Sequence, residues 1–264
     1  MGRIGYVDEK DAKTGTAAEE PRETTVESLS ALAAALVKIF FVLTFVVHAF
    51  EIPSSSMENT LLIGDHVLVN RIQFAPRTSW IGPLLPYREV QRGDIVVFLA
   101  PCEPGLYVVK RIMGVPGDRI HLRNGVVYRN GERLQEPYVI HSEPVYPNTY
   151  RDDFPALPAS ESANVYPCWE QEMEKHVQGE DLVVPPGRYF AMGDNRDVSL
   201  DSRYWGFIPQ ENLIGRPMFV YWSFETPDGQ YRKTGMADRL GFLAHVVWHF
   251  FDETRWGRTL KVVR

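Results

Sequence analysis

The sequence predicts a mostly β domain that follows a single N-terminal membrane-spanning helix. Residues 28–50 form an apolar run long enough to cross a bilayer as a helix. Beyond it lie short runs rich in β-branched and aromatic residues, separated by Gly, Pro and Asn, as is typical of strands and tight turns. Hydrophobic residues make up 44% and charged residues 23% of the 264 residues, which suits one large domain or two small ones.

Residues 1–27 precede the apolar run, are polar and show no hydrophobic period. A segment of this composition buries too little apolar surface to become ordered, so we expect a disordered tail.

The apolar run at 28–50 is interrupted only by Lys38 and His48. A lysine near the centre of a span costs roughly 3 kcal/mol on insertion, although its stem can reach toward the surface. The alternatives are a buried helix of a soluble protein and a cleaved signal peptide. The long polar tail ahead of the run and the absence of an A-x-A site after it argue against cleavage. We therefore expect one uncleaved anchor.

The distribution of basic residues predicts the orientation of this anchor. Arg22 lies just before the span, other basic residues lie further upstream, and none follows the span until Arg71. By the positive-inside rule the tail is cytoplasmic and residues 51–264 lie outside, in a single-pass protein of the plasma (inner) membrane.

The part of the chain after the anchor contains seven β-branched runs that we expect to be strands: residues 65–71, 94–99, 106–115, 119–122, 126–129, 188–192 and 213–223. Asn124-Gly125 between two of them is a strong hairpin signal. Residues 136–186 are polar and rich in proline, which predicts an inserted β and loop subdomain at about 123–187. Residues 236–251 have helical apolar spacing and are the one further helix expected. Packing of that helix on the core is favoured over contact with a membrane surface.

Charge and cysteine content exclude some classes of function. A net charge of −6 argues against nucleic acid as a partner, because phosphate binding needs a basic surface. Cys102 and Cys168 are too few for a disulfide scaffold. They can pair if the domain is exported, and the sequence leaves this open.

A candidate nucleophile lies six residues past the anchor, where Ser56 ends a run of three serines after Pro53. Serine-rich turns commonly cap helices or fill loops, so this segment alone is a weak signal.

A candidate base lies in the run VVKRIM, where Lys110 precedes Arg111. On a strand these two side chains point to opposite faces, so one is expected to face inward. A free lysine, with a pKa of about 10.4, is almost wholly protonated at neutral pH. Burial lowers that pKa by up to about 3 to 5 units, and a base near pH 7 stores roughly 4 to 5 kcal/mol of unfavourable charging energy. The alternative is an exposed lysine on an edge strand.

A third segment, residues 189–206, combines a strand with a turn dense in hydrogen-bonding groups. Its charged residues can form a web of charge-assisted bonds that fixes the loop. They are Asp194, Arg196, Asp197, Asp201 and Arg203.

Five segments in this order resemble the sequence boxes of bacterial type I signal peptidases, the membrane-anchored Ser/Lys endopeptidases that remove signal peptides from exported proteins. The segments are PSSSM, GDHVLVNR, RGDIVVF, VKRIMGVPGD and GDNRDVSLDSRYWGFIP. The resemblance covers residues 50–122 and 189–219. It implies the mostly β fold that this family shares with self-cleaving repressors, with antiparallel and partly barrel-like sheets.

The resemblance implies catalytic roles by position. Ser56 corresponds to the nucleophile and Lys110 to the general base. Ser54 resembles the oxyanion-hole hydroxyl, which acts together with the backbone N–H of Ser56. Ser199 matches the serine that orients the lysine amine. The chemistry would be acyl transfer without a cofactor or a metal.

Further residues match supporting positions of the family. Asp201 and Arg203 correspond to a supporting salt bridge. Phe50, Ile52 and Val109 fall where the family forms shallow pockets for small side chains. The resemblance therefore implies small residues at positions −1 and −3 of the substrate. The implied partners are the lipid bilayer and preproteins that carry signal peptides, with no nucleic acid.

Two departures from the family pattern occur beside the nucleophile. The usual M-x-P-T-L reads MENTL here, so Asn59 replaces a proline. The usual small residue between the two box serines is Ser55, which adds a hydroxyl.

Other chemistries fit the sequence less well. A Ser/His/acid triad could use His66, His121 or His141, but there is no G-x-S-x-G elbow. A metallopeptidase could use His245 and His249, but there is no H-E-x-x-H motif. A self-cleaving repressor would need a DNA-binding domain where this chain has an apolar span. A catalytically inactive membrane scaffold would have no need of the serine and the lysine.

Overall fold

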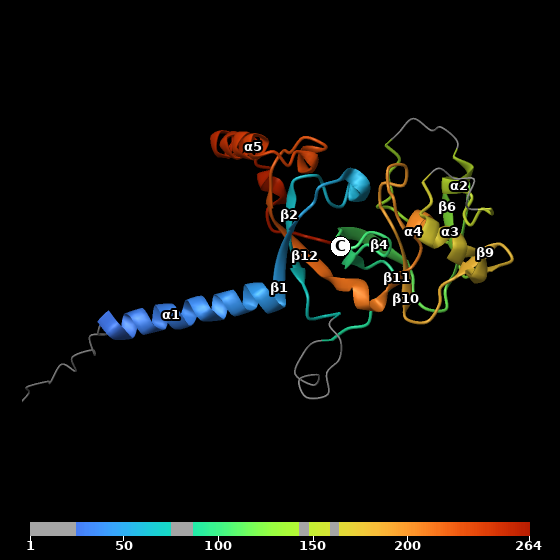
Figure 1. The fold of residues 1–264 in the computed structure, drawn as a ribbon, viewed down its shortest axis with the longest axis horizontal. Helices are drawn as coiled ribbons and strands as arrows, with labels where there is room; N and C mark the ends of the chain where they lie inside the picture. Colours follow the sequence, from blue (N-terminus) through green and yellow to red (C-terminus); the bar gives the residue numbers. More distant parts are fainter. Residues whose placement is uncertain (1–24, 75–86, 143–147, 159–163) are drawn as a thin grey trace, which may run out of the picture. The chain divides into compact units, whose positions relative to one another are not determined.

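The computed structural model describes residues 25–74, 87–142, 148–158 and 164–264 (Figure 1). The chain divides into two compact units, Met1–Phe41 and Val42–Arg264. Both β-sheets belong to the second unit. The predicted class, mostly β with one N-terminal apolar helix, is confirmed.

The N-terminal helix α1 (Thr25–Phe41) continues as a π-helical turn, η1 (Val42–Val46). Together they form a helix of 22 residues with a mean hydropathy of 2.4, long and apolar enough to cross a membrane. The helix therefore lies earlier than the predicted range 28–50. Its end is set by β1 (Val47–Glu51), whose residues pair with β2 instead of continuing the helix. The predicted tail lies outside the described residues, except that Thr25–Glu27 already belong to α1.

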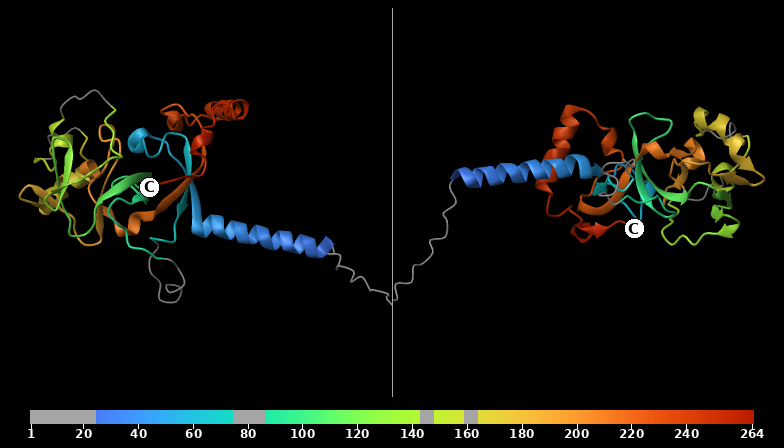
Figure 2. Two further views of the ribbon diagram at one scale, coloured as in Figure 1. Left: turned by 180° about the vertical axis from the view of Figure 1, so that it is seen from behind. Right: turned by 90° about the horizontal axis from the view of Figure 1, so that it is seen from below.

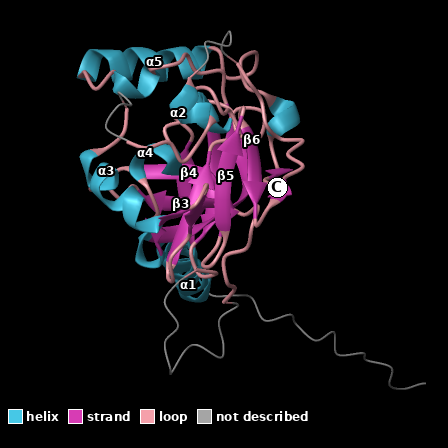
Figure 3. Ribbon diagram, turned by 90° about the vertical axis from the view of Figure 1, so that its right-hand side faces the viewer, coloured by secondary structure: helices cyan, strands magenta, loops and turns pink. Residues whose placement is uncertain are grey.

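The larger sheet has eight strands, each antiparallel to its neighbours, in the order β1-β2-β12-β3-β4-β10-β11 with β13 beside β12. The further strands are β2 (Asp65–Asn70), β3 (Ile95–Leu99), β4 (Tyr107–Gly114), β10 (Arg188–Met192), β11 (Ile208–Pro209), β12 (Leu213–Ser223) and β13 (Lys261–Val262). β12 pairs with both β2 and β3, and its pairing register shifts at several points. Such irregularities bend a strand and increase its twist, and the sheet accordingly curls (Figure 3).

The smaller sheet has five antiparallel strands in the order β7-β6-β5-β9-β8. They are β5 (Arg119–Arg123), β6 (Val126–Arg129), β7 (Glu132–Arg133), β8 (Val177–Gln178) and β9 (Asp181–Val183). Asn124 and Gly125 join β5 to β6 with positive φ angles of 49° and 76°, as the hairpin signal requires. The strands of this sheet occupy the region predicted as the insertion and begin slightly before it.

Short helices make up the rest of the second unit. α2 (Thr149–Asp152) and α3 (Pro167–Met173) lie within the inserted region, and α4 (Ser202–Trp205) follows β10. The expectation of a single helix besides the anchor is therefore wrong. Each of these three has at most seven residues, too few for an amphipathic period to be recognised. Single 3₁₀ turns are η2 (Ser55–Met57), η5 (Glu174–His176), η6 (Gln210–Asn212), η7 (Gln230–Arg232) and η8 (Trp256–Arg258).

Helix α5 (Met236–Trp248) forms close to where the periodicity predicts a helix, but only one side of it packs on the domain. None of its residues is buried. Phe242 and Val246 are half-buried and face Phe224, while the rest of the helix is exposed. α5 lies at the end of the unit near β2, away from α3 (Figures 1 and 2).

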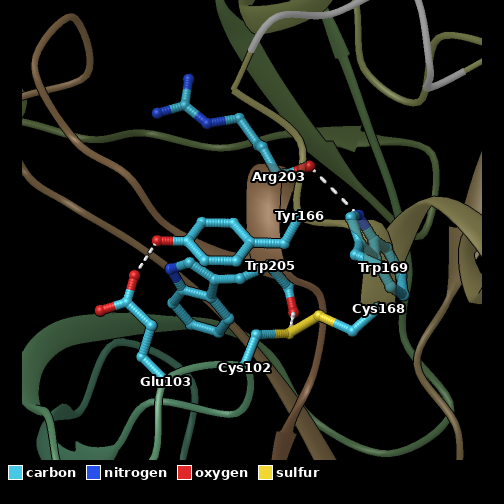
Figure 4. The surroundings of a disulfide bond; sticks show 7 residues. All are labelled: Cys102, Glu103, Tyr166, Cys168, Trp169, Arg203 and Trp205. Atoms are coloured by element: carbon cyan, nitrogen blue, oxygen red, sulfur yellow. Dashed lines mark hydrogen bonds between the residues drawn. A yellow bond between two sulfur atoms is a disulfide. The ribbon is translucent and has the colours of Figure 1, made fainter.

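A disulfide joins Cys102, just after β3, to Cys168 in α3, across 66 residues (Figure 4). It ties the larger sheet to the inserted region. Next to it, Trp169 is 1% exposed and donates its indole N–H to the carbonyl oxygen of Arg203 at 3.1 Å. The insertion is thus fastened close to α4.

Candidate active site

Ser56 lies in the 3₁₀ turn η2, five residues after the end of β1. Met57 is fully buried and packs with apolar residues of β2, β3 and β12, which fixes this turn to the core. The turn closes when the N–H of Leu61 donates to the carbonyl oxygen of Met57 at 2.7 Å. Ser56 itself is 6% exposed, so its hydroxyl lies in a largely dry environment.

Lys110 lies on β4 opposite Val96 of β3 and is 3% exposed. Its Nζ is 2.6 Å from Ser56 Oγ, within hydrogen-bonding distance. The sheet thereby brings together two predicted residues that are 54 positions apart in the sequence.

Burial lowers the pKa of Lys110 from its ordinary value of 10.5 to about 8. The carboxylates of Asp201 and Asp194 oppose this shift, and the guanidinium of Arg203 adds to it. Desolvation therefore outweighs the attraction of the nearby acids. The amine is thus poised to lose its proton close to neutral pH.

Arg111, on the opposite face of β4, is buried as well, at 4% exposure. Nε and Nη2 donate to the two carboxylate oxygens of Asp194 at 2.8 and 2.7 Å, and its guanidinium lies 3.9 Å from the ring centre of Tyr138. The expectation that one of Lys110 and Arg111 faces inward is met by both, because Asp194 and Tyr138 cover the second face of β4.

Asp201 and Arg203 form a buried bidentate pair, with both N–H···O distances at 2.8 Å. Their side chains are 0% and 1% exposed. Burial opposes ionisation of Asp201, but the attraction of Arg203 prevails and holds the pKa of Asp201 below its usual value. Asp201 also accepts the backbone N–H of Gly193 at 3.1 Å, so the pair supports the end of β10.

Gly193 is a site residue whose importance the sequence did not reveal. A Cβ at this position would lie 2.3 Å from Ser199 Oγ and 2.4 Å from the carbonyl oxygen of Ser56, closer than atoms can approach. The same carbonyl accepts the N–H of Asn195 at 3.1 Å. Only glycine therefore lets the end of β10 support the turn that carries Ser56. The available signal was a Gly-Asp pair directly after a strand.

The two further predicted serines lie close to this centre. Ser54 Oγ is 3.4 Å from Ser56 Oγ and is partly buried. Ser199 is 3% exposed, and its hydroxyl lies close enough to the carboxylate of Asp201 to help hold the pKa of Asp201 below its usual value. It packs against Gly193.

The three predicted pocket residues share one apolar cluster. Ile52 is 2% exposed, and Phe50 and Val109 are partly buried against the same group. The ring of Phe50 lies 5.2 Å from that of Tyr107. These side chains come from β1, the segment after it and β4, the elements that flank Ser56 and Lys110.

Asn59, which replaces the usual proline, has a φ of 80°. Proline is fixed near −65° and could not adopt this conformation, whereas asparagine tolerates it. The Asn59 side chain also donates to the carbonyl oxygen of Tyr138 at 3.2 Å. The turn after the nucleophile is thus held by a left-handed residue and a long-range hydrogen bond.

The charged web predicted within residues 189–206 forms only in part. Asp201 pairs with Arg203 inside the segment, but Arg196 pairs with Glu136, and Asp197 contacts His141 and Arg151. Arg196 and Asp197 thus connect the loop to the inserted region, whereas Asp194 pairs with Arg111 of β4.

The structure does not support a catalytic site in which a histidine activates Ser56. His121 bonds Asp181 at 2.6 Å on the smaller sheet, and His66 stacks on Trp222. No hydrogen bond of Ser56 with a described residue involves an imidazole. One cluster in the described ranges could hold a metal ion, formed by His245, His249 and Glu253 at the end of α5. Its histidines already bond carboxylates, and it is not among the contacts of Ser56.

A serine hydroxyl hydrogen-bonded to a buried amine in an antiparallel β-domain is the arrangement expected of a serine peptidase. A family model described as signal peptidase, peptidase S26, matches residues 25–222. The chain belongs to this family and is a serine peptidase. Membership supports the cleavage of signal peptides as its activity, with preproteins as substrates, and the family is membrane-associated.

Individual relatives agree with this assignment. A signal peptidase I of Pseudomonas fluorescens is 35% identical over 206 residues, which are 70% of this chain and 68% of the relative. One from Buchnera aphidicola subsp. Baizongia pistaciae is 30% identical over 256 residues, covering 82% and 83% of the two chains. A crystal structure of a signal peptidase I from Enterococcus faecalis is 32% identical, covers 49% of this chain and 97% of that chain, and has a TM-score of 0.32.

Proposed function

We propose that this chain is a membrane-anchored signal peptidase in which Ser56 is the nucleophile and Lys110 its general base. The observation that carries the proposal is the 2.6 Å contact between Ser56 Oγ and the buried Nζ of Lys110. Neutral Nζ takes the proton of Ser56, whose Oγ attacks the carbonyl carbon of the scissile bond. Lys110 then returns the proton to the leaving amine, and a water molecule hydrolyses the acyl-enzyme.

Ser54 and the backbone N–H of Ser56 would stabilise the oxyanion, each donor contributing about 3 kcal/mol. The position of Ser54 Oγ beside Ser56 Oγ supports this role. Ser199, Asp201 and Arg203 would position the lysine. Their burial around Gly193, which touches the turn of the nucleophile, supports a positioning role.

Phe50, Ile52 and Val109 would form the floor of shallow pockets for small residues at positions −1 and −3 of the substrate. A floor made of packed apolar side chains leaves little depth for a large residue. Signal peptides with an A-x-A ending are therefore the proposed substrates.

The helix Thr25–Val46 would cross the plasma membrane once, with the tail in the cytoplasm and the catalytic domain outside. The absence of lysine and arginine between the span and Arg71 supports this orientation. The Cys102–Cys168 disulfide is independent support, because disulfides persist in oxidising compartments such as the periplasm and the cell exterior.

Cleavage of a preprotein with an A-x-A site by the full chain in detergent tests the assignment. Ser56→Ala should abolish cleavage, and Lys110→Arg should do the same because arginine stays charged. Ser55→Ala is the matched control, since it removes a neighbouring hydroxyl that has no assigned role. Wild-type rates in a folded Ser56→Ala protein would show that the nucleophile lies elsewhere.

A further inference from the structure

Helix α5 carries a second apolar stripe that is largely exposed. Met236, Leu240, Leu243 and Val247 follow at intervals of four, three and four residues, the spacing of one helical face. They are 76%, 59%, 58% and 71% exposed. Phe242 and Val246 are half-buried and line the groove between α5 and Phe224, which Leu243 borders at the edge of the stripe. The domain thus accounts for one apolar face of α5 and leaves another uncovered.

Exposed aromatic side chains lie at the end of the helix and beyond it. Trp248 is 85% exposed, Phe251 80% and Trp256 51%. Trp is enriched where proteins meet the headgroup region of a bilayer, because its ring is apolar and its N–H can remain hydrated. Arg232, Lys233 and Arg239 are exposed in and just before α5 and could meet anionic headgroups.

The chain itself holds α5 close to the point where the apolar span ends. The span ends at Val46, and β1 begins at the next residue. Glu51, at the far end of β1, lines the same groove of about 490 Å³ as Phe242 and Val246 of α5. Since a strand rises about 3.3 Å per residue, this groove begins within roughly 17 Å of the end of the span.

The length and composition of α5 decide how it can meet a bilayer. Its 13 residues would measure about 20 Å, too short to cross a hydrocarbon core of about 30 Å. A helix with one apolar face, aromatic residues and nearby cations is instead typical of a segment that lies in the plane of the interface. The family match ends at residue 222, so α5 lies beyond the matched region.

We propose that α5 lies on the outer surface of the membrane, with Met236, Leu240, Leu243, Val247 and Trp248 in the interface. This second attachment limits the tilting of the catalytic domain about its anchor. It thereby keeps Ser56 at a fixed height, where a membrane-inserted preprotein presents its cleavage site. The inference rests on the proposed membrane span, and its test separates the two.

The test uses the full chain carrying Ser56→Ala, reconstituted in vesicles of phosphatidylglycerol and phosphatidylcholine brominated near the glycerol end of the acyl chains. Bromine quenches tryptophans that reach this depth. We expect a large part of the lipid-dependent quenching to disappear in Trp248→Phe. Leu243→Asp/Val247→Asp should weaken it too, whereas Leu157→Asp, at a residue 48% exposed in the inserted region, should not.

The outcomes are distinguishable. Unchanged quenching in Trp248→Phe, with the protein still resistant to carbonate extraction, would overturn the proposal for α5 alone. Loss of the protein from the vesicles would refute the span as well. Concentration-dependent crosslinking through α5, with no lipid quenching of Trp248, would assign the stripe to a second copy of the chain and also refute the proposal.

A second measurement uses the catalytic chain with an intact Ser56. In Leu243→Asp/Val247→Asp, cleavage of a membrane-inserted preprotein should fall several-fold, while cleavage of a short water-soluble peptide should stay unchanged. An equal loss for both substrates would point to damaged folding or chemistry and would contradict a role in docking.

Discussion

Replacing Lys110 with methionine should increase stability at neutral pH, although it removes the proposed base. The folded state holds the pKa of Lys110 at about 8 instead of 10.5. At about 1.4 kcal/mol per pH unit, keeping this lysine protonated at pH 7 costs the folded state about 3 kcal/mol. Lys110→Met removes that cost and loses one hydrogen bond to Ser56, which contributes about 1 kcal/mol. We therefore expect a net gain of about 2 kcal/mol in the free energy of unfolding.

The pH dependence shows the direction of the stability change and also provides a control. Below pH 8 both the folded and the unfolded chain hold the proton on Lys110, so the whole cost is present. Between pH 8 and pH 10.5 only the unfolded chain binds it, so the stability of the wild type rises with pH through this window. Above that window the cost is gone, and Lys110→Met should be slightly less stable than the wild type.

Denaturant unfolding of both full-length proteins in the same detergent, at several pH values, measures the difference. Comparing the two curves at each pH cancels the titration of all other groups. A stability difference that stays constant from pH 7 to pH 11 would refute the reasoning, because Lys110 would then have its ordinary pKa in the folded protein.

Three further predictions follow from the site. The rate of cleavage should rise with pH, because only neutral Lys110 can accept the proton of Ser56. kcat/KM should increase about fivefold from pH 7 to pH 8 and level off above the pKa of about 8. A flat profile would exclude this lysine as the base. Gly193→Ala should lose most activity because its Cβ would displace the turn of the nucleophile, whereas Gly257→Ala, with nothing within 4 Å, should keep it; equal activities would show that the contact is unimportant. Replacing both Cys102 and Cys168 with serine removes a disulfide that closes a 66-residue loop and should lower the free energy of unfolding by about 4 kcal/mol. A reductant should no longer affect the stability of this variant. Unchanged unfolding in urea would contradict the prediction.

The sequence predicted those parts of the site that depend on local pattern. The β-branched runs formed strands because alternation and turn residues at their ends agree with the fold. Ser56 and Lys110 could be named as candidates because five ordered segments together resemble a known family, although neither residue's own segment is a strong signal alone. Their meeting across 54 residues depends on how β4 lies beside the turn after β1, and no local pattern encodes it.

Ion pairs between residues that are distant in the sequence could not be predicted. Arg111 finds Asp194 across 83 residues, and Arg196 finds Glu136 across 60. From the sequence alone, the charged residues of 189–206 could be paired with one another within that segment. In the folded chain Arg111 of β4 and residues of the inserted region supply competing partners.

Gly193 illustrates a different limit. The sequence shows a glycine in a common turn, and many such glycines only serve a positive φ angle. Gly193 is not among the glycines with positive φ in this structure. Glycine is required at this position because Ser56 and Ser199 lie too close to it to leave room for a Cβ atom. A steric need of this kind exists only after the tertiary structure has formed.

The partial packing of α5 on the domain has a physical cause that bears on its role. A hydrophobic period shows that a helix face avoids water, but it does not show whether protein or lipid covers that face. In a chain with an apolar span, lipid is available as a second apolar phase. α5 has two apolar faces, and the domain covers only that of Phe242 and Val246. A stripe in which every residue is more than half exposed would be costly in a protein surrounded by water, and at a membrane surface it becomes a means of attachment.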